Sequence, residues 1–179
     1  MKRGFWILAA LAMTVAACGI AGWPDWQDWR RTQVLNESRP ESDMAVLAGT
    51  EIRIRRQAVL TLPDLPDRAV IWLQLAVSPT PAAAASLGGC NPVLRDSRGR
   101  RFLPLSDELG LKLLKILGRD WAISCAQSLR AADGAGAVSD QVYLVPVDVV
   151  DALELEVSGP ETRPDGAIFT LSPQPLTLP

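Results

Sequence analysis

Residues 69–77, AVIWLQLAV, form a nearly uninterrupted apolar run, and this run decides the fold. A strand with one face in water alternates apolar and polar side chains, whereas this run offers apolar side chains to both faces. It therefore predicts a strand that is buried on both sides or lies at the centre of a sandwich. Trp72 stands in the middle of the run.

Shorter strand patterns lie on both sides of this run. EIRIRRQAVL (51–60) places Ile52 and Ile54 between charged residues and then becomes apolar. LPDLPDR (62–68) contains two prolines and predicts the turn that connects the two strands. CNPVLRDSRGRRFLPL (90–105) predicts a hairpin that turns at 96–99. Further strand patterns occupy 141–147, 152–159 and 167–171.

The segment ALELEVSG (152–159) alternates most cleanly, because Leu153, Leu155 and Val157 share one face and two glutamates share the other. We expect a half-buried strand here. The following residues 163–166 predict a tight turn, in which a proline fixes φ and a glycine accepts a positive φ.

SDELGLKLLKILG (106–118) is the one helical pattern. Ser106 can cap its start, acidic residues follow in the first turn, and Gly118 suits its end. We expect this helix to pack across one end of the sheet; contact with a membrane is the alternative. The apolar face consists of Leu109, Leu113, Ile116 and Leu117.

Six or seven short strands with turns between them and one short helix predict a mainly β fold, an antiparallel β-sandwich. The chain has 179 residues, of which 48% are hydrophobic and 21% are charged, as expected of one globular domain. We place the sandwich domain at 50–172. A membrane or signal segment (1–22) and a Trp-rich juxtamembrane segment with a linker (23–49) precede it, and a Pro-rich tail (173–179) follows.

The N-terminal segment predicts export. Lys2 and Arg3 precede an uncharged run (4–22), which as a helix measures about 28 Å and just crosses a bilayer core. The preceding charges predict a cytoplasmic N-terminus and an extracytoplasmic C-terminal domain. Three fates stay open. The segment is a cleaved signal, a lipoprotein signal in which VAAC (15–18) resembles a lipobox and Cys18 is lipidated, or an uncleaved signal anchor.

The apolar run continues past Cys18, which favours the anchor, and three tryptophans follow it. Trp23, Trp26 and Trp29 recur at every third position. Indole rings favour the headgroup zone of a bilayer, so we expect these residues to lie at the membrane interface. An aromatic platform for a ligand or a glycan is the alternative.

Cys90 and Cys125 are the two cysteines of the exported part. In an oxidising compartment such a pair most simply forms a disulfide. Their separation does not resemble a thiol-exchange motif, so we expect a structural bridge.

Composition argues against several activities. The sequence has no histidine and therefore lacks the commonest general base and metal ligand. A serine nucleophile would depend on Lys112 or Lys115, which lie on the polar side of the predicted helix. Asp133 and Asp140 flank a glycine-rich loop but lack the spacing of a calcium loop. We expect no catalytic residues, no cofactor and no metal.

The charge pattern bears on partners. The net charge is −2, and no basic stripe is present, so we expect no nucleic acid partner. Two arginine clusters stand out, and a solvated sheet face explains them most simply. A surface for an anionic partner or lipid is the functional reading. The clusters are Arg53, Arg55 and Arg56, and Arg95, Arg98, Arg100 and Arg101.

The layout resembles a family of exported, membrane-anchored immunoglobulin-like domains of unknown function from GC-rich Gram-positive bacteria. The resemblance spans residues 1 to about 172. It rests on the basic start, the Trp-containing stretch, VIWLQLAV (70–77), the cysteine before VLRDSRGRRF (93–102), the second cysteine, and VYLVPV (142–147). It implies an immunoglobulin-like β-sandwich in the cell envelope and transfers no catalytic residue.

Together these features predict a non-catalytic, membrane-tethered extracytoplasmic domain that binds or scaffolds a partner in the envelope or the membrane. The alternative is an enzyme that acts on envelope polymers through a pair of carboxylates.

Overall fold

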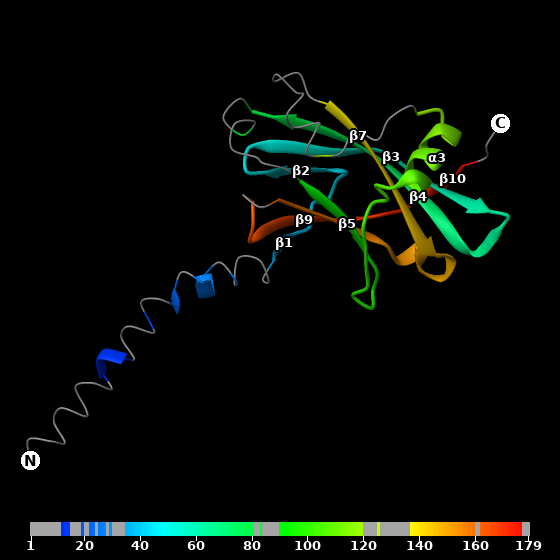
Figure 1. Cartoon of the computed structure of the whole chain (residues 1–179). Helices are drawn as coiled ribbons and strands as arrows, with labels where there is room; N and C mark the ends of the chain where they lie inside the picture. Colours follow the sequence, from blue (N-terminus) through cyan, green and yellow to red (C-terminus); the bar gives the residue numbers. More distant parts are fainter. Residues whose placement is uncertain are drawn as a thin grey trace, which may run out of the picture. The chain divides into compact units, whose positions relative to one another are not determined.

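A computed structural model describes the part of the chain from residue 35 onward with few gaps (Figure 1). The chain divides into two compact units, Met1–Leu35 and Asn36–Pro179. The described residues are 35–80, 83, 90–119, 125, 137–159 and 162–176, together with isolated positions between 12 and 29.

The second unit consists of two sheets of five strands each. The β4 sheet contains, in spatial order, β10 (Gln174–Pro175), β3 (Thr50–Leu62), β4 (Leu65–Pro79) and β7 (Ala137–Pro146), with β2 (Met44–Leu47) also paired to β3. The β8 sheet contains β1 (Asn36–Ser38), β9 (Asp165–Thr170), β8 (Glu154–Ser158), β5 (Asn91–Arg95) and β6 (Arg101–Phe102). The other described elements are the helix α3 (Glu108–Ile116) and the 3₁₀ helix η1 (Val147–Ala152).

The expectation of a mainly β sandwich is confirmed, and the strand directions are mixed. Most neighbouring strands run antiparallel, including the long β3–β4 and β4–β7 pairs. Two short edge strands run parallel to their neighbours, β1 along β9 and β10 along β3. The predicted purely antiparallel pattern therefore holds for the long strands and is wrong at these edges.

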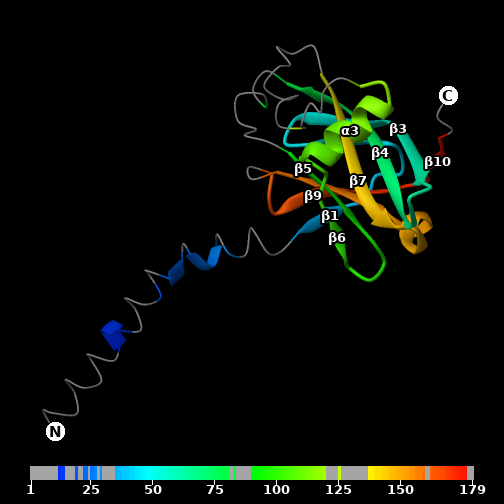
Figure 2. The ribbon, with the colours of Figure 1, turned by 45° about the vertical axis from the view of Figure 1, so that its right-hand side comes forward.

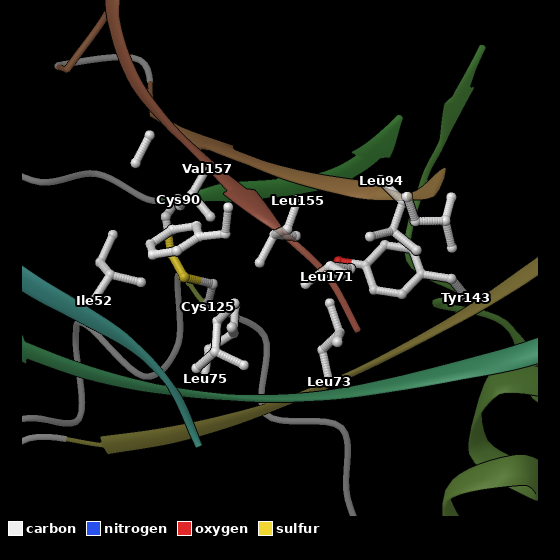
Figure 3. Close-up of a cluster of buried hydrophobic side chains, with 14 of the residues drawn as sticks. Ile52, Leu73, Leu75, Cys90, Leu94, Cys125, Tyr143, Leu155, Val157 and Leu171 are labelled. Atoms are coloured by element: carbon white, nitrogen blue, oxygen red, sulfur yellow. A yellow bond between two sulfur atoms is a disulfide. The ribbon is translucent and has the colours of Figure 1, made fainter. Parts of the chain in front are cut away.

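The main core lies between the two sheets (Figure 3). Side chains from one sheet, such as Leu73 and Leu75 of β4, meet Leu155 and Val157 of β8, all of them fully buried. The alternation predicted for 152–159 is thus confirmed on its apolar face. Tyr143 crosses this core, where its hydroxyl donates to the carbonyl of Pro92 at 3.2 Å, and burial raises its pKa.

Helix α3 lies over the outer face of the β4 sheet (Figure 2), and a second apolar cluster lies between the helix and this face. Leu113 and Leu114 of the helix pack against Val70, Trp72 and Val142. The central strand is therefore buried on both faces, as the sequence predicts. The reason is that the second sheet covers one face and α3 covers the other.

The details of α3 differ from the prediction. Asp107 rather than Ser106 caps the helix, and its Oδ1 accepts from the backbone N–H of Gly110 at 3.1 Å. Gly118 ends the helix with a φ of 72°, as expected. The packed face is rotated from the predicted one, because Leu109 and Ile116 are 40% and 52% exposed.

Strand β3 changes the faces of its side chains at a bulge. Ile54 pairs with Leu75 and Arg56 pairs with Gln74, so Arg55 is an extra residue. Before the bulge, Ile52 and Ile54 point into the core between the sheets. After it, Ala58 and Leu60 point to the outer face beneath α3.

The predicted domain boundaries are too narrow. Residues 36–38 and 44–47, predicted as part of a linker, form β1 and β2, and the compact unit begins at Asn36. In the predicted tail, Gln174–Pro175 pairs with Ala58 and Val59 of β3. Short edge strands of two to four residues carry too few side chains to show a period in sequence.

Two predicted turns also differ in detail. Strands β3 and β4 are joined at Pro63 and Asp64 alone, and Pro66 already belongs to β4. Gly166 lies inside β9 rather than in the turn, and its φ is not positive.

Candidate functional site

The outer edge of β3 is paired along most of its length but not at the bulge. On one side of the bulge, β2 pairs as far as Arg53, and the Asp43 carbonyl accepts from the Ile54 N–H at 2.8 Å. On the other side, β10 begins pairing at Ala58. Residues 55–57 therefore have no strand partner on this edge within the described chain.

A half-open groove of about 360 Å³ lies at this break in pairing. We call it the β3 groove. Its apolar lining includes Ala58, Pro175 and Leu176. The polar residues of its described lining are Asp43, Arg55, Arg56, Gln57 and Gln174.

Neither arginine of the β3 groove forms an ion pair with a carboxylate of the described residues. Arg56 instead lies over the indole ring of Trp72, with its guanidinium carbon 5.2 Å from the ring centroid. Such a cation–π contact fixes the plane of the guanidinium and leaves its N–H groups available at the edges. Arg55 is the bulged residue, and a bulge turns a side chain away from the regular alternation.

A buried carboxylate holds Trp72 in place. The indole N–H of Trp72 donates to Asp140 Oδ1 at 2.9 Å, and Gln74 donates to the same oxygen at 3.2 Å. Arg119, just after α3, pairs with Asp140 Oδ2 at 3.1 Å. Asp140 therefore has a structural role, and its possible calcium partner Asp133 lies outside the described residues.

The side chains of the two glutamines of the groove hydrogen-bond to the backbone of Ser172, which follows β9. Gln57 Oε1 accepts from the backbone N–H of Ser172 at 2.8 Å. The side-chain amide of Gln174 donates to the Ser172 carbonyl at 3.0 Å. The bond to Gln57 and the pairing of β10 with β3 hold the segment 172–176 against β3, and the bond from Gln174 lies within that segment. The segment forms one wall of the groove.

The second predicted arginine cluster belongs to the other sheet, at the β5–β6 hairpin. Arg100 pairs with the buried Asp96 at 2.6 Å, and Arg101 pairs with Glu156 at 2.9 Å. The Arg98 backbone N–H donates to Asp96 Oδ1 at 2.9 Å in the turn. Asp96 is buried, which alone would raise its pKa, but the bonds from Arg100 and the turn lower it overall.

The predicted partner surface is therefore not one surface. Arg53 forms an ion pair with Glu51 at 3.2 Å and does not line the β3 groove. Arg100 and Arg101 neutralise carboxylates of their own sheet. Of the residues in the two predicted clusters, the structure places Arg55 and Arg56 in the groove.

The outer face of the β8 sheet carries an ion-pair network. Arg95 bridges Glu37 at 2.6 Å and Glu154 at 3.0 Å, and Arg39 bonds to the same two carboxylates. The bond from Arg95 lowers the pKa of Glu37, and the bond from Arg39 lowers the pKa of Glu154, in each case against the opposite effect of burial. The network joins side chains of β1, β5 and β8, so we assign it a structural role in this sheet.

The predicted disulfide is formed, and it lies in the core between the sheets (Figure 3). Cys90 and Cys125 are both buried, with their Cα atoms 5.4 Å apart. This separation is ordinary for a disulfide. The bridge closes the part of the chain that contains the β5–β6 hairpin and α3.

The predicted interface tryptophans are helical and exposed. Trp23, Trp26 and Trp29 are 57%, 44% and 57% exposed, and the rings of the first two lie 5.0 Å apart. Cys18, the predicted lipidation site, lies outside the described residues. Among the residues that are described, no helix has the length and apolar character needed to span a membrane.

No protein family, no curated protein and no solved structure matches the chain. The groove itself is therefore the basis for a functional assignment. The sequence pattern points to Arg55 and Arg56 but not to Asp43 and Gln174, which belong to the predicted linker and tail. The signal that could have pointed to the groove is the double arginine that interrupts the alternation of 51–60.

Proposed function

We propose that this chain is a non-catalytic, membrane-tethered extracytoplasmic domain that binds a partner in the cell envelope or the membrane through the β3 groove. The observation that carries the proposal is the pair of arginines at the break in β3 pairing. Arg56 is held on Trp72, and neither Arg55 nor Arg56 is neutralised by a described carboxylate. Such a site suits recognition of an anion.

The chemistry of the groove supports binding rather than catalysis. Guanidinium groups stay protonated at physiological pH and do not act as general acids or bases. Asp43 is the one carboxylate among the described lining residues, which therefore offer no pair of carboxylates such as a glycosidase uses. The site can attract and orient an anion.

The extracytoplasmic location is supported by the disulfide and by the N-terminal sequence. Disulfides persist in oxidising compartments and are rare in the cytosol. The basic start followed by the apolar run (4–22) is the pattern of an export signal or anchor. Mass spectrometry of the mature N-terminus separates an anchor, a lipidated Cys18 and free secretion; an intact N-terminus on a protein recovered from the cytosol would refute this part of the proposal.

The binding role is tested by purifying the full chain in mild detergent from the membranes of its own cells. We expect a partner to be retained by the native chain and by Arg53→Gln, which removes one exposed positive charge outside the groove. We expect the double variant Arg55→Gln/Arg56→Gln to lose it. A native chain that is strictly monomeric and retains no partner refutes the proposal, as does retention that is unchanged in the double variant.

A second groove favours the enzymatic alternative. Glu41 and Asp43 both line a polar groove of about 300 Å³ between Pro40 and Thr170. Two carboxylates in one groove are the minimum for acid–base hydrolysis of a glycoside. Turnover of envelope glycans that is lost in Glu41→Gln and in Asp43→Asn would establish this activity, and absence of turnover by the native chain would end it.

The immunoglobulin-like topology stays a prediction of the sequence resemblance. Two packed sheets with a buried disulfide support it. In antibody domains a buried tryptophan packs against the disulfide between the sheets. Here Trp72 lies on the outer face of the β4 sheet, away from the cluster that contains Cys90 and Cys125, which counts against it.

A further inference from the structure

We propose that the β3 groove binds a phosphodiester group, with Arg55 and Arg56 as its ligands. The inference rests on the proposed binding function and names the chemistry that the partner presents. A phosphodiester occurs in phospholipid headgroups and in polymers of glycerol phosphate. All of these sources share the same singly charged oxyanion between two carbon substituents.

The charge of the groove matches a single negative charge. Among the described residues, its lining contains two guanidinium groups and one carboxylate, that of Asp43, which gives these residues a net charge of +1. A phosphate monoester carries about −1.5 to −2 at pH 7, so part of its charge would stay uncompensated by these residues. A phosphodiester carries one negative charge, so the groove neutralises it fully.

The geometry of the arginines favours phosphate over carboxylate. A carboxylate has two oxygens in one plane and is satisfied by a single guanidinium fork. Arg55 and Arg56 are adjacent in sequence, so a regular strand would point them to opposite faces. At the bulge both line the same groove, and Arg56 is fixed on the face of Trp72. Two guanidinium forks in one groove can share the tetrahedral oxygens of a phosphate, whereas a carboxylate needs one fork.

The walls of the groove suit the substituents of a diester. Pro175, Leu176 and Ala58 provide apolar surface beside the arginines, which can contact the carbon atoms on either side of the phosphate. The groove is half open, and its volume of about 360 Å³ exceeds that of a phosphate group alone. A ligand that continues beyond the phosphate therefore fits, as lipid headgroups and glycerol phosphate polymers do.

A membrane source is within reach of the domain if residues 1–22 are the tether. Thirteen residues separate Gly22 from Asn36, the first residue of β1. Fully extended, they span at most about 50 Å. A tethered domain thus stays close to the headgroups of the membrane, where the local concentration of phosphodiesters is high.

The test uses the full chain in a neutral detergent and isothermal titration calorimetry. The probes are glycerophosphoglycerol, which is a phosphodiester without acyl chains, and acetate. We expect glycerophosphoglycerol to bind more tightly than acetate, and Arg55→Gln/Arg56→Gln to weaken it at least about tenfold, as for loss of charge-assisted bonds. The matched control Arg53→Gln should bind within about twofold of the native chain, because an exposed ion pair outside the groove contributes little.

Three results would overturn the proposal. They are the absence of glycerophosphoglycerol binding to the native chain, equal or tighter binding of acetate, and unchanged binding by the double variant. Competition then distinguishes the sources, both of which support the proposal. If phosphatidylglycerol added to the micelles displaces glycerophosphoglycerol, the source is a lipid; if soluble poly(glycerol phosphate) alone displaces it, the source is a polymer.

The phosphodiester assignment and the proposed binding function can be refuted independently of each other. If a partner is retained through Arg55 and Arg56 but glycerophosphoglycerol does not bind, the binding function stands and the phosphodiester assignment is wrong. If glycerophosphoglycerol binds through these arginines but the chain is cytosolic, the assignment stands and the extracytoplasmic function is wrong.

Discussion

Deletion of Arg55 should leave the sandwich folded, although a one-residue deletion in a paired strand normally turns its side chains to the wrong face. The reason is the register between β3 and β4, in which Ile54 pairs with Leu75 and Arg56 pairs with Gln74. Arg55 is the extra residue between these pairs. Without it the two strands can pair continuously, and every other side chain of β3 keeps its present face.

The matched control is deletion of Arg53, an exposed arginine of the same strand. This deletion makes Ile52 and Ile54 neighbours, so one of them must leave the core. They are 3% and 6% exposed, and burial of such a side chain contributes about 1.5–3 kcal/mol. We expect deletion of Arg53 to lower the free energy of unfolding by at least about 2 kcal/mol, and deletion of Arg55 to lower it by less than about 1 kcal/mol.

Equilibrium unfolding in urea, followed by far-UV circular dichroism with the disulfide intact, measures both values. The slope against urea should be the same for both variants and the native chain, because the folded states bury similar surface. The reasoning is refuted if deletion of Arg55 costs as much as deletion of Arg53. It is also refuted if both deletions are harmless, because the faces of Ile52 and Ile54 would then not depend on the register.

Three further changes test the packing. Asp140→Ala should lower the free energy of unfolding by about 3 kcal/mol, because it leaves the buried indole N–H of Trp72 without an acceptor. Asp140→Asn keeps an acceptor and should lower the free energy of unfolding by about 1 kcal/mol. Equal losses for the two variants in chemical denaturation would contradict this. Joint replacement of Cys90 and Cys125 by alanine should cost about 4 kcal/mol, since the bridge restricts a long loop of the unfolded chain; an unchanged melting temperature would contradict it. The pKa of Glu154 is lowered in the folded state, so its contribution to stability is complete above the ordinary pKa of 4.5 and is lost as the pH falls through the lower folded value. The melting temperature should therefore fall below about pH 4.5, and this fall should be smaller in Glu154→Gln; a pH profile identical to that of the native chain would exclude this contribution.

Much of the fold follows from local signals in the sequence. The run 69–77 identifies the central strand because only a doubly covered strand tolerates apolar residues at consecutive positions. Alternation identifies β8, and Gly118 marks the end of α3 because glycine adopts the positive φ that a helix end requires. These features depend on residues close together in the chain, so periodicity and turn chemistry are sufficient.

Other features depend on residues far apart and therefore escape a local analysis. Strands β1, β2 and β10 are too short to show a period and exist because a longer strand offers a free edge beside them. Glu156 alternates as a solvent-facing residue should, yet it is buried, because Arg101 and Arg163 reach it from other segments. The sequence gives no measure of such coverage.

The β3 groove lies where the regular alternation of side chains along a strand is interrupted. Ile54 and Ala58 are four positions apart and would share a face in a regular strand, yet they point to opposite faces of the β4 sheet. The extra residue Arg55 explains why Ile54 and Ala58 point to opposite faces. Arg55 also lies where the edge pairing of β3 is interrupted, and it is one of the two arginines of the groove. The same change of face places Arg56 on the side of Trp72, where the indole can hold it. The bulge thus creates the opening, supplies one charge and orients the other, so a variant with a continuous β3 should keep its fold and lose the anion site.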